Sequence, residues 1–325
     1  MSTEPALTDL SAAVLARGGE LRAGGTDTTA RQRSGIAPGP FTDLDGAAGL
    51  RGCTPLPGGG LRIGALTTLA ELATDPQVRS GWPALAVSAG TAATPQIRAA
   101  GTLGGNLLQR NRCWYYRNPH FSCLQKGGSG CPAREGDHHF GVVSGDGPCV
   151  APHPSTLAMA LLTYDAGAEV HGESPRTVAA LYGDGDGDGL HRADHLLAPD
   201  RILTAVLLPP PLPGERAACH RATSRAQGEW PLVEATARLA LDGDGVTVTH
   251  AAVAAGGVAR VPLRLLEVEA ALIGRKATPG LLADAAATVL ARCRPLSQTG
   301  YKATLFRDTV LEVLERAADL PASID

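Results

Sequence analysis

Four cysteines gather in the middle of the chain, in a stretch without helical or strand periodicity. The stretch RNRCWYYRNPHFSCLQKGGSGCPAREGDHH covers residues 110–139 and contains Cys113, Cys123 and Cys131, and Cys149 follows it. Thiolates are the ligands of iron–sulfur clusters and of many structural zinc ions. This stretch is therefore the first candidate for a metal or cluster site.

The spacing of these cysteines bears on which group they could hold. Nine, seven and seventeen residues separate them, whereas structural zinc sites contain pairs separated by about two to four residues. The pattern therefore disfavours zinc, which stays open as an alternative together with four unligated thiols. The other cysteines, Cys53, Cys219 and Cys293, are isolated in the sequence, and we expect them to be small buried residues.

Two glycine loops form the second candidate site. They read AGGTDT, from residue 23 to 28, and GTLGGN, from residue 101 to 106. Paired glycines permit positive φ and leave no side chain between the backbone and a ligand, so successive N–H groups can converge on an anion such as a pyrophosphate. Neither loop matches the nicotinamide fingerprint or a Walker loop. Each alone is more typical of a simple turn, and the pair makes a nucleotide cofactor and two simple turns equally good interpretations.

The composition limits the class of protein. A length of 325 residues predicts about two domains. The net charge of −3 gives no basic field for nucleic acid or an acidic membrane, and no apolar run reaches the ~20 residues of a membrane span. The first residues, MSTEPALTDL, lack the features of a signal peptide, and seven cysteines is an odd number. We therefore expect a protein of a reducing compartment, the cytoplasm by default.

Regular elements flank the candidate loops. LRIGALTTLAELA predicts a strand and then a helix, which Thr68 and Glu71 begin with a capping box. STLAMALL predicts a helix followed by a strand. Beyond a proline-rich linker near residue 210, WPLVEATARLAL reads as a buried helix or strand, and DGDG predicts a hairpin turn. A last helix carries an apolar face formed by Phe306, Val310, Val313, Leu314 and Ala317.

These segments resemble a known family in their order along the chain. LRAGGTDT, LRIGALTT, IRAAGTLGGNLL and HPSTLAMALLTYDA are similar to segments of the flavin subunit of the molybdenum hydroxylases, which include xanthine dehydrogenase, carbon monoxide dehydrogenase and aldehyde oxidoreductases. GGVARVPLRLLEVEAAL and SQTGYKATLFRDTVLEVL resemble its C-terminal domain. The resemblance implies an α+β fold: a vanillyl-alcohol-oxidase-type FAD-binding domain of two subdomains at 1–210, with an iron–sulfur insert at about 110–150, and a small α+β domain at 211–325.

The resemblance also implies which residues contact FAD. The pyrophosphate would lie between the two loops, at Ala23, Gly24, Gly25, Thr26, Asp27, Thr28, Gly101, Thr102, Gly104, Gly105 and Asn106. Closer to the flavin ring would lie His153, Ser155, Leu203 and Arg221. Leu203 corresponds to an aliphatic residue packed on the isoalloxazine, and Arg221 to a position that is lysine in many relatives. Thr156 stands where the family usually has aspartate.

The cysteine stretch resembles the cluster loop of hydroxybenzoyl-CoA reductase and of the bacterial heterotrimeric aldehyde oxidoreductases. Cys113, Cys123, Cys131 and Cys149 would then ligate a [4Fe-4S] cluster. The implied function is electron transfer, with no catalytic residue in this chain. A molybdopterin-binding large subunit would oxidise an aldehyde or aromatic heterocycle, and a [2Fe-2S] small subunit would pass electrons to FAD and on to an external acceptor. The alternatives are a stand-alone FAD oxidoreductase and, for location, a periplasmic complex exported by a partner's signal.

Overall fold

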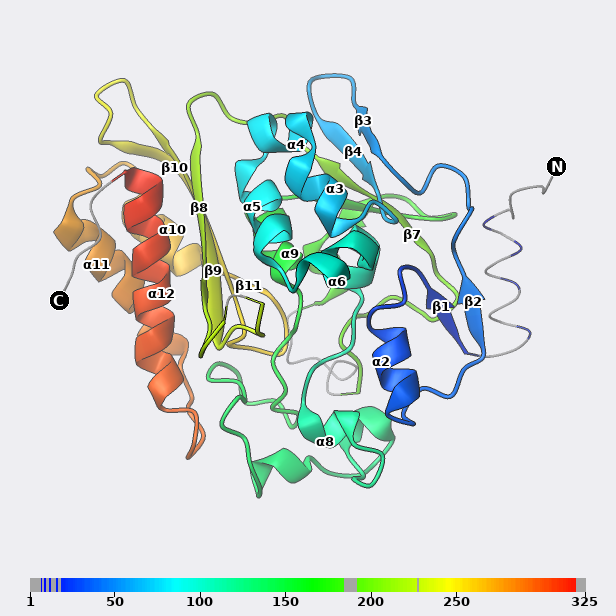
Figure 1. The fold of residues 1–325 in the computed structure, drawn as a ribbon. Helices are drawn as coiled ribbons and strands as arrows, with labels where there is room; N and C mark the ends of the chain where they lie inside the picture. Colours follow the sequence, from blue (N-terminus) through cyan, green and yellow to red (C-terminus); the bar gives the residue numbers. More distant parts are fainter. Residues whose placement is uncertain are drawn as a thin grey trace.

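The computed structural model describes residues 19–183, 192–226 and 228–319, and residues 7, 9, 12 and 16 singly. In this part of the chain the strands form three sheets. Two of them belong to the first two thirds of the sequence, and the third belongs to the last third (Figure 1).

A five-stranded sheet with a layer of helices beside it forms the centre of the molecule. The sheet has the order β3-β4-β7-β5-β6. The strands are β3 (Cys53–Pro55), β4 (Leu61–Gly64), β5 (Gly167–Val170), β6 (Arg176–Thr177) and β7 (Leu203–Leu208). Helices that gather beside it are α3 (Leu69–Thr74), α4 (Pro76–Gly81), α5 (Pro83–Thr91), α6 (Pro95–Ala100) and α9 (Thr156–Thr163) (Figure 1). Ile63, Ala168 and Val206 are fully buried between these layers.

The predicted capping box at the start of α3 is confirmed. The Thr68 side chain accepts from the Glu71 amide at 3.2 Å, and the Glu71 carboxylate accepts from the Thr68 amide at 2.8 Å. This reciprocal pair satisfies two amides at the helix start.

The two glycine loops each join one element to a short helix. The first loop follows β1 (Glu20–Arg22), which pairs in parallel with β2 (Phe41–Asp43), and leads into α2 (Thr28–Arg33). The second loop begins directly after α6 and forms most of the short helix α7 (Leu103–Leu107).

The C-terminal part is an antiparallel sheet covered by helices. The order is β11-β10-β9-β8, with β8 (Arg216–Ala222), β9 (Val233–Leu241), β10 (Val248–Gly256) and β11 (Leu263–Arg264). Helices α10 (Leu266–Leu272), α11 (Pro279–Ala287) and α12 (Tyr301–Ala318) lie on one side (Figure 1). The predicted apolar face of α12 is confirmed, because Phe306, Val310, Val313, Leu314 and Ala317 are all fully buried.

The cysteine stretch forms a lobe at one end of the molecule, at the bottom of Figure 1. It holds α8 (Trp114–Arg117) and two 3-10 turns, Leu124–Lys126 and Pro132–Arg134. The buried ammonium of Lys302 at the start of α12 donates to the carbonyls of Phe140, Gly141 and Gly257, which attaches the lobe to the C-terminal part. No helix in the described part of the chain is both long and apolar enough to span a membrane.

Candidate functional site

The two glycine loops face each other across a cleft of about 380 Å³. Nearly all of the loop residues selected from the sequence line it, together with Leu203: Ala23, Gly24, Gly25, Thr26, Asp27, Thr28, Thr102, Gly104 and Gly105. Gly101 is buried behind the cleft, where its carbonyl accepts from the Leu69 amide at 2.9 Å. The fold thus brings together two loops that lie about 80 positions apart in the sequence.

The backbone of the first loop fits an anion such as a pyrophosphate. Gly25 has a φ of +71°, which turns the chain into α2. The amides of Thr26, Asp27 and Thr28 donate no hydrogen bond to any described residue, as is usual for the first amides of a helix. These donors border the cleft, so the residues present match the needs of an FAD pyrophosphate.

The Asp27 side chain has a different role from its backbone. Its carboxylate contacts Arg31 at 2.9 Å, Arg112 at 3.0 Å and Arg117 at 2.7 Å. Burial by itself would raise the pKa of Asp27, but Arg112 and Arg117 outweigh it and lower the pKa. Since Arg112 and Arg117 belong to the cysteine lobe, the ionised Asp27 side chain joins the first glycine loop to that lobe.

Asn106 and Ser155 contact each other. The Ser155 hydroxyl donates to Asn106 Oδ1 at 2.8 Å and accepts from the Ala158 amide at 3.2 Å, and Asn106 Oδ1 also accepts from the Leu157 amide. Ser155 is fully buried as the N-cap of α9. This pair therefore fixes the end of the second glycine loop against α9.

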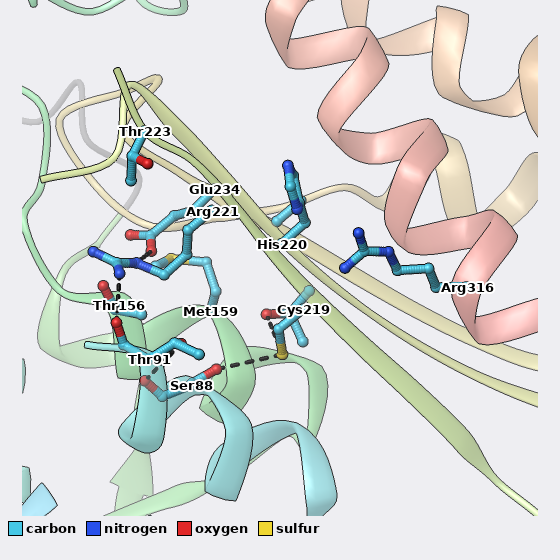
Figure 2. Close-up of a pocket in the computed structure, with 12 residues that line it drawn as sticks. Ser88, Thr91, Thr156, Met159, Cys219, His220, Arg221, Thr223, Glu234 and Arg316 are labelled. Carbon is cyan, nitrogen blue, oxygen red and sulfur yellow. Dashed lines mark hydrogen bonds and ion pairs between the residues drawn. The ribbon is translucent and has the colours of Figure 1, made fainter. Parts of the chain in front are cut away.

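Arg221 lies in another pocket, shown in Figure 2. This pocket of about 240 Å³ lies between α5, α9 and the β8–β9 pair. The Arg221 guanidinium donates to the Thr91 carbonyl at 2.5 Å and lies 3.6 Å from the Glu234 carboxylate. Thr156 lines the same pocket. The structure therefore groups Arg221 with Thr156 and Glu234, apart from the residues that line the glycine-loop cleft.

Glu234 is a site residue that the sequence reading missed. It is buried within β9, and burial raises its pKa to about 7 although Arg221 and the Thr156 hydroxyl lower it in part. Its only sequence signal is a carboxylate inside the mostly apolar run LVEATARLAL, which also contains Thr236 and Arg238.

The raised pKa of Glu234 predicts a pH-dependent effect of Glu234→Gln. Between the ordinary pKa of 4.5 and about 7, the folded chain keeps a proton that the unfolded chain has lost, so this group's contribution to stability falls as the pH rises through that window. The variant, which cannot titrate there, should gain stability relative to wild type by at most about 3 kcal/mol across the window. Urea unfolding at about pH 5 and about pH 8 measures the gain. Glu135→Gln, at an exposed position, is the matched control; a pH-independent difference for Glu234→Gln would contradict the prediction.

The four clustered cysteines converge on one small cavity. Cys113, Cys123, Cys131 and Cys149 all line it. Among the described residues, no three His, Cys, Asp or Glu side chains are close enough together to hold a single metal ion. Four thiols that line one cavity are the donor type that both iron–sulfur clusters and structural zinc ions use, so this cavity is the candidate metal centre.

A buried carboxylate, Asp194, holds the segments around this cavity. It accepts from Arg110 at 2.8 Å, Arg260 at 2.9 Å and the Asn111 amide at 3.0 Å. Burial would raise the pKa of Asp194, but these arginines hold it well below its usual range. Gln125 donates to Asp194 and lies 3.9 Å from the Cys149 sulfur. No local sequence pattern marks Asp194, which lies 66 to 84 positions from the residues it binds.

Comparison with known proteins gives matches along nearly the whole chain. A family model described as the FAD binding domain in molybdopterin dehydrogenase matches residues 4–211, and one described as the CO dehydrogenase flavoprotein C-terminal domain matches residues 218–319. The chain is 33% identical over 307 residues to the aldehyde oxidoreductase FAD-binding subunit PaoB of Escherichia coli (strain K12), which covers 92% of each chain.

Solved structures show the same fold at low sequence identity. A chain of the reconstituted CO dehydrogenase from Oligotropha carboxidovorans superimposes with a TM-score of 0.74 at 20% identity, covering 97% of this chain and 96% of that one. A chain of quinoline 2-oxidoreductase from Pseudomonas putida 86 gives a TM-score of 0.72 at 18% identity, covering 98% and 99%.

Proposed function

Because this chain belongs to the family of FAD-binding subunits of the molybdopterin-dependent dehydrogenases, we propose that it transfers electrons through FAD and a [4Fe-4S] cluster within a molybdenum hydroxylase. Its partners are a molybdopterin-binding large subunit and a [2Fe-2S] small subunit. The complex oxidises an aldehyde or an aromatic heterocycle on the large subunit, and the electrons leave through this chain. The relative most similar to it among those described above is a subunit of an aldehyde oxidoreductase.

The observation that supports the proposal is the set of side-chain contacts that connects the two candidate cofactor sites. Asp27 lines the glycine-loop cleft, and its carboxylate holds Arg112, which directly precedes Cys113. Arg110 also lines the cleft while its guanidinium binds Asp194, which holds Gln125 beside Cys149. A partly buried carboxylate, Asp27, and a fully buried one, Asp194, thus link the walls of both sites, an arrangement expected for two cofactors that exchange electrons.

The residues of this chain would bind and orient FAD and would offset the negative charge of a cluster. The amides at the start of α2 and the Thr102 side chain at the start of α7 would hold the pyrophosphate of FAD. FAD, when bound, would accept single electrons from a [2Fe-2S] cluster and store two of them for an external acceptor. Arg260 lies near Cys149, and Arg112 directly precedes Cys113, so their charge would offset that of a thiolate-ligated cluster.

The experiment that tests this function uses the chain purified with its partner subunits. Adding an aldehyde without oxygen should bleach both the flavin band and the broad iron–sulfur absorption. Bleaching by an aldehyde of the isolated chain, without the molybdopterin subunit, would instead favour a stand-alone oxidoreductase. Persistence of both bands in the intact complex with every aldehyde and heterocycle offered would contradict the proposal.

A further inference from the structure

Two arginines of the cysteine lobe hold the first glycine loop by its carboxylate. Arg112 and Arg117 lie 3.0 Å and 2.7 Å from the Asp27 carboxylate, and the Arg110 amide donates to it at 3.3 Å. The loop leads into α2, which lies beside the lobe in Figure 1. The Asp27 side chain is only 12% exposed, so water and salt screen these contacts only in part.

Arg112 also connects the first glycine loop to the second. Its guanidinium donates to Gln109 Oε1 at 2.6 Å, and Gln109 donates to the carbonyl of Asn106, the last residue of the second loop, at 2.9 Å. The guanidinium carbon lies 4.3 Å from the ring centre of Trp230 in the C-terminal part. Gln109, like Asp27, lines the glycine-loop cleft. A shift of Arg112 would therefore change the contacts of both loops at once.

The positions of both arginines depend on Cys113, one of the four clustered cysteines. Arg112 directly precedes Cys113, and Arg117 is the last residue of the single helical turn, α8, that follows it. The Cys113 carbonyl accepts from the Arg117 amide at 2.9 Å, and the Cys113 amide donates to the buried Asn111 side chain at 3.0 Å. Ligation of a metal group fixes the backbone around each ligand. A cluster bound to Cys113 would thus fix both guanidinium groups.

The two arginines also offset negative charge at this wall of the glycine-loop cleft. Asp27 and Glu20 both line the cleft, and both contact the guanidinium of Arg31 in α2, at 2.9 Å and 2.8 Å. Without the lobe, two carboxylates would share one cation here, and the excess negative charge would repel a pyrophosphate. With Arg112 and Arg117 in place, the cations outnumber the carboxylates. The lobe therefore makes this wall fit for an anionic ligand.

We propose that Arg112 and Arg117 are positioning residues through which the cysteine lobe controls the affinity of the chain for FAD. In the cluster-loaded lobe they hold the two glycine loops together and offset the charge of Asp27. In a lobe without its cluster these contacts loosen, and FAD binds more weakly. The inference rests on the proposed function, from which it takes both cofactors, and it adds that they bind cooperatively. Coupling between two sites typically changes affinity by about 5- to 150-fold.

The test measures the FAD dissociation constant in a double-mutant cycle, using the full chain with its partner subunits. Wild type, Cys123→Ser, Arg117→Met and the double variant are depleted of flavin and titrated with FAD while the flavin fluorescence is followed. Cys123→Ser, which lacks the cluster, should bind FAD about tenfold or more weakly than wild type. Arg117→Met should keep its iron and show a similar loss. Because both changes remove the same contact, the double variant should bind within about twofold of either single variant.

Arg134→Met is the matched control. Arg134 is an exposed arginine of the same lobe whose guanidinium donates to two backbone carbonyls rather than to Asp27, so this variant should bind FAD as wild type does. If Arg117→Met loses its iron, Asp27→Asn makes the comparison from the side of the loop. Its FAD dissociation constant should be the same with and without the Cys123→Ser change, since an amide cannot form the ion pairs that join loop and lobe.

Equal FAD affinity of wild type and Cys123→Ser would overturn the inference and leave both cofactors, and with them the proposed function, in place. A double variant in which the two losses multiply would also overturn it, because the cluster would then act on FAD without Arg117. Conversely, FAD binding that depends on the cluster as described, in a complex whose flavin band no aldehyde or heterocycle bleaches, would refute the proposed function and leave the inference standing.

Discussion

Replacing Cys123 with serine is expected to reduce the iron and sulfide of the purified protein from about four of each per chain to nearly none. Cys123 is buried and lines the cavity on which the other three clustered cysteines converge. A serine hydroxyl is a poor ligand for iron in a cluster, and three remaining thiolates hold the cube weakly. Iron and acid-labile sulfide analysis, with the electron paramagnetic resonance spectrum of the reduced protein, measures the loss.

The matched control is Cys53→Ser. Cys53 lies in β3, far along the chain from the cluster stretch, and burial raises the pKa of its thiol to about 12, which disfavours the thiolate that metals bind. This variant should keep the full iron and sulfide content. Zinc in place of iron in the wild-type protein, or unchanged iron in Cys123→Ser, would refute the cluster assignment.

The regular elements were predictable because local patterns determine them. The Thr68–Glu71 capping box and the apolar face of α12 follow from residues within one or a few turns, and both are present in the structure. For β9 the sequence left helix and strand open. The reason is that residues 233–240 are all buried, so the alternation that identifies a half-exposed strand is missing.

The geometry of the site depends on contacts that no local pattern encodes. The cysteine spacing disfavoured zinc, but it did not indicate that Asp194 would bind Arg110 and Arg260, which lie 150 positions apart. The Asp27 residue lines the glycine-loop cleft as expected from the sequence, and its carboxylate also binds arginines of the cysteine lobe, which the sequence did not indicate. A sequence shows which side chains carry charge, whereas the partner of each charge is set by tertiary packing.

The largest effect on FAD is expected from Gly24→Val. A Cβ at Gly24 would lie 1.7 Å from the Ala100 carbonyl oxygen, and this is a backbone atom directly before the second glycine loop. The clash can be relieved only by separating the two loops, because neither side of the contact is a flexible side chain. A pyrophosphate that needs donors from both loops should then bind at least about a hundredfold more weakly, equivalent to about 2.7 kcal/mol. The flavin content after gel filtration and the FAD dissociation constant measure this loss.

Gly280→Val is the control that shows whether any glycine-to-valine change reduces FAD binding or only the change in the first glycine loop. Gly280 lies in α11, and a Cβ there would meet no atom within 4 Å, so this variant should retain FAD. The cysteine lobe is attached through Asp27 and Asp194 rather than through Gly24, so Gly24→Val should keep its iron and sulfide. Retained iron with lost FAD would identify a local defect of the glycine-loop cleft, whereas loss of both would indicate unfolding. Full FAD occupancy in Gly24→Val would mean that the cofactor does not require the contact between the two loops, and the assignment of the pyrophosphate to this cleft would be wrong.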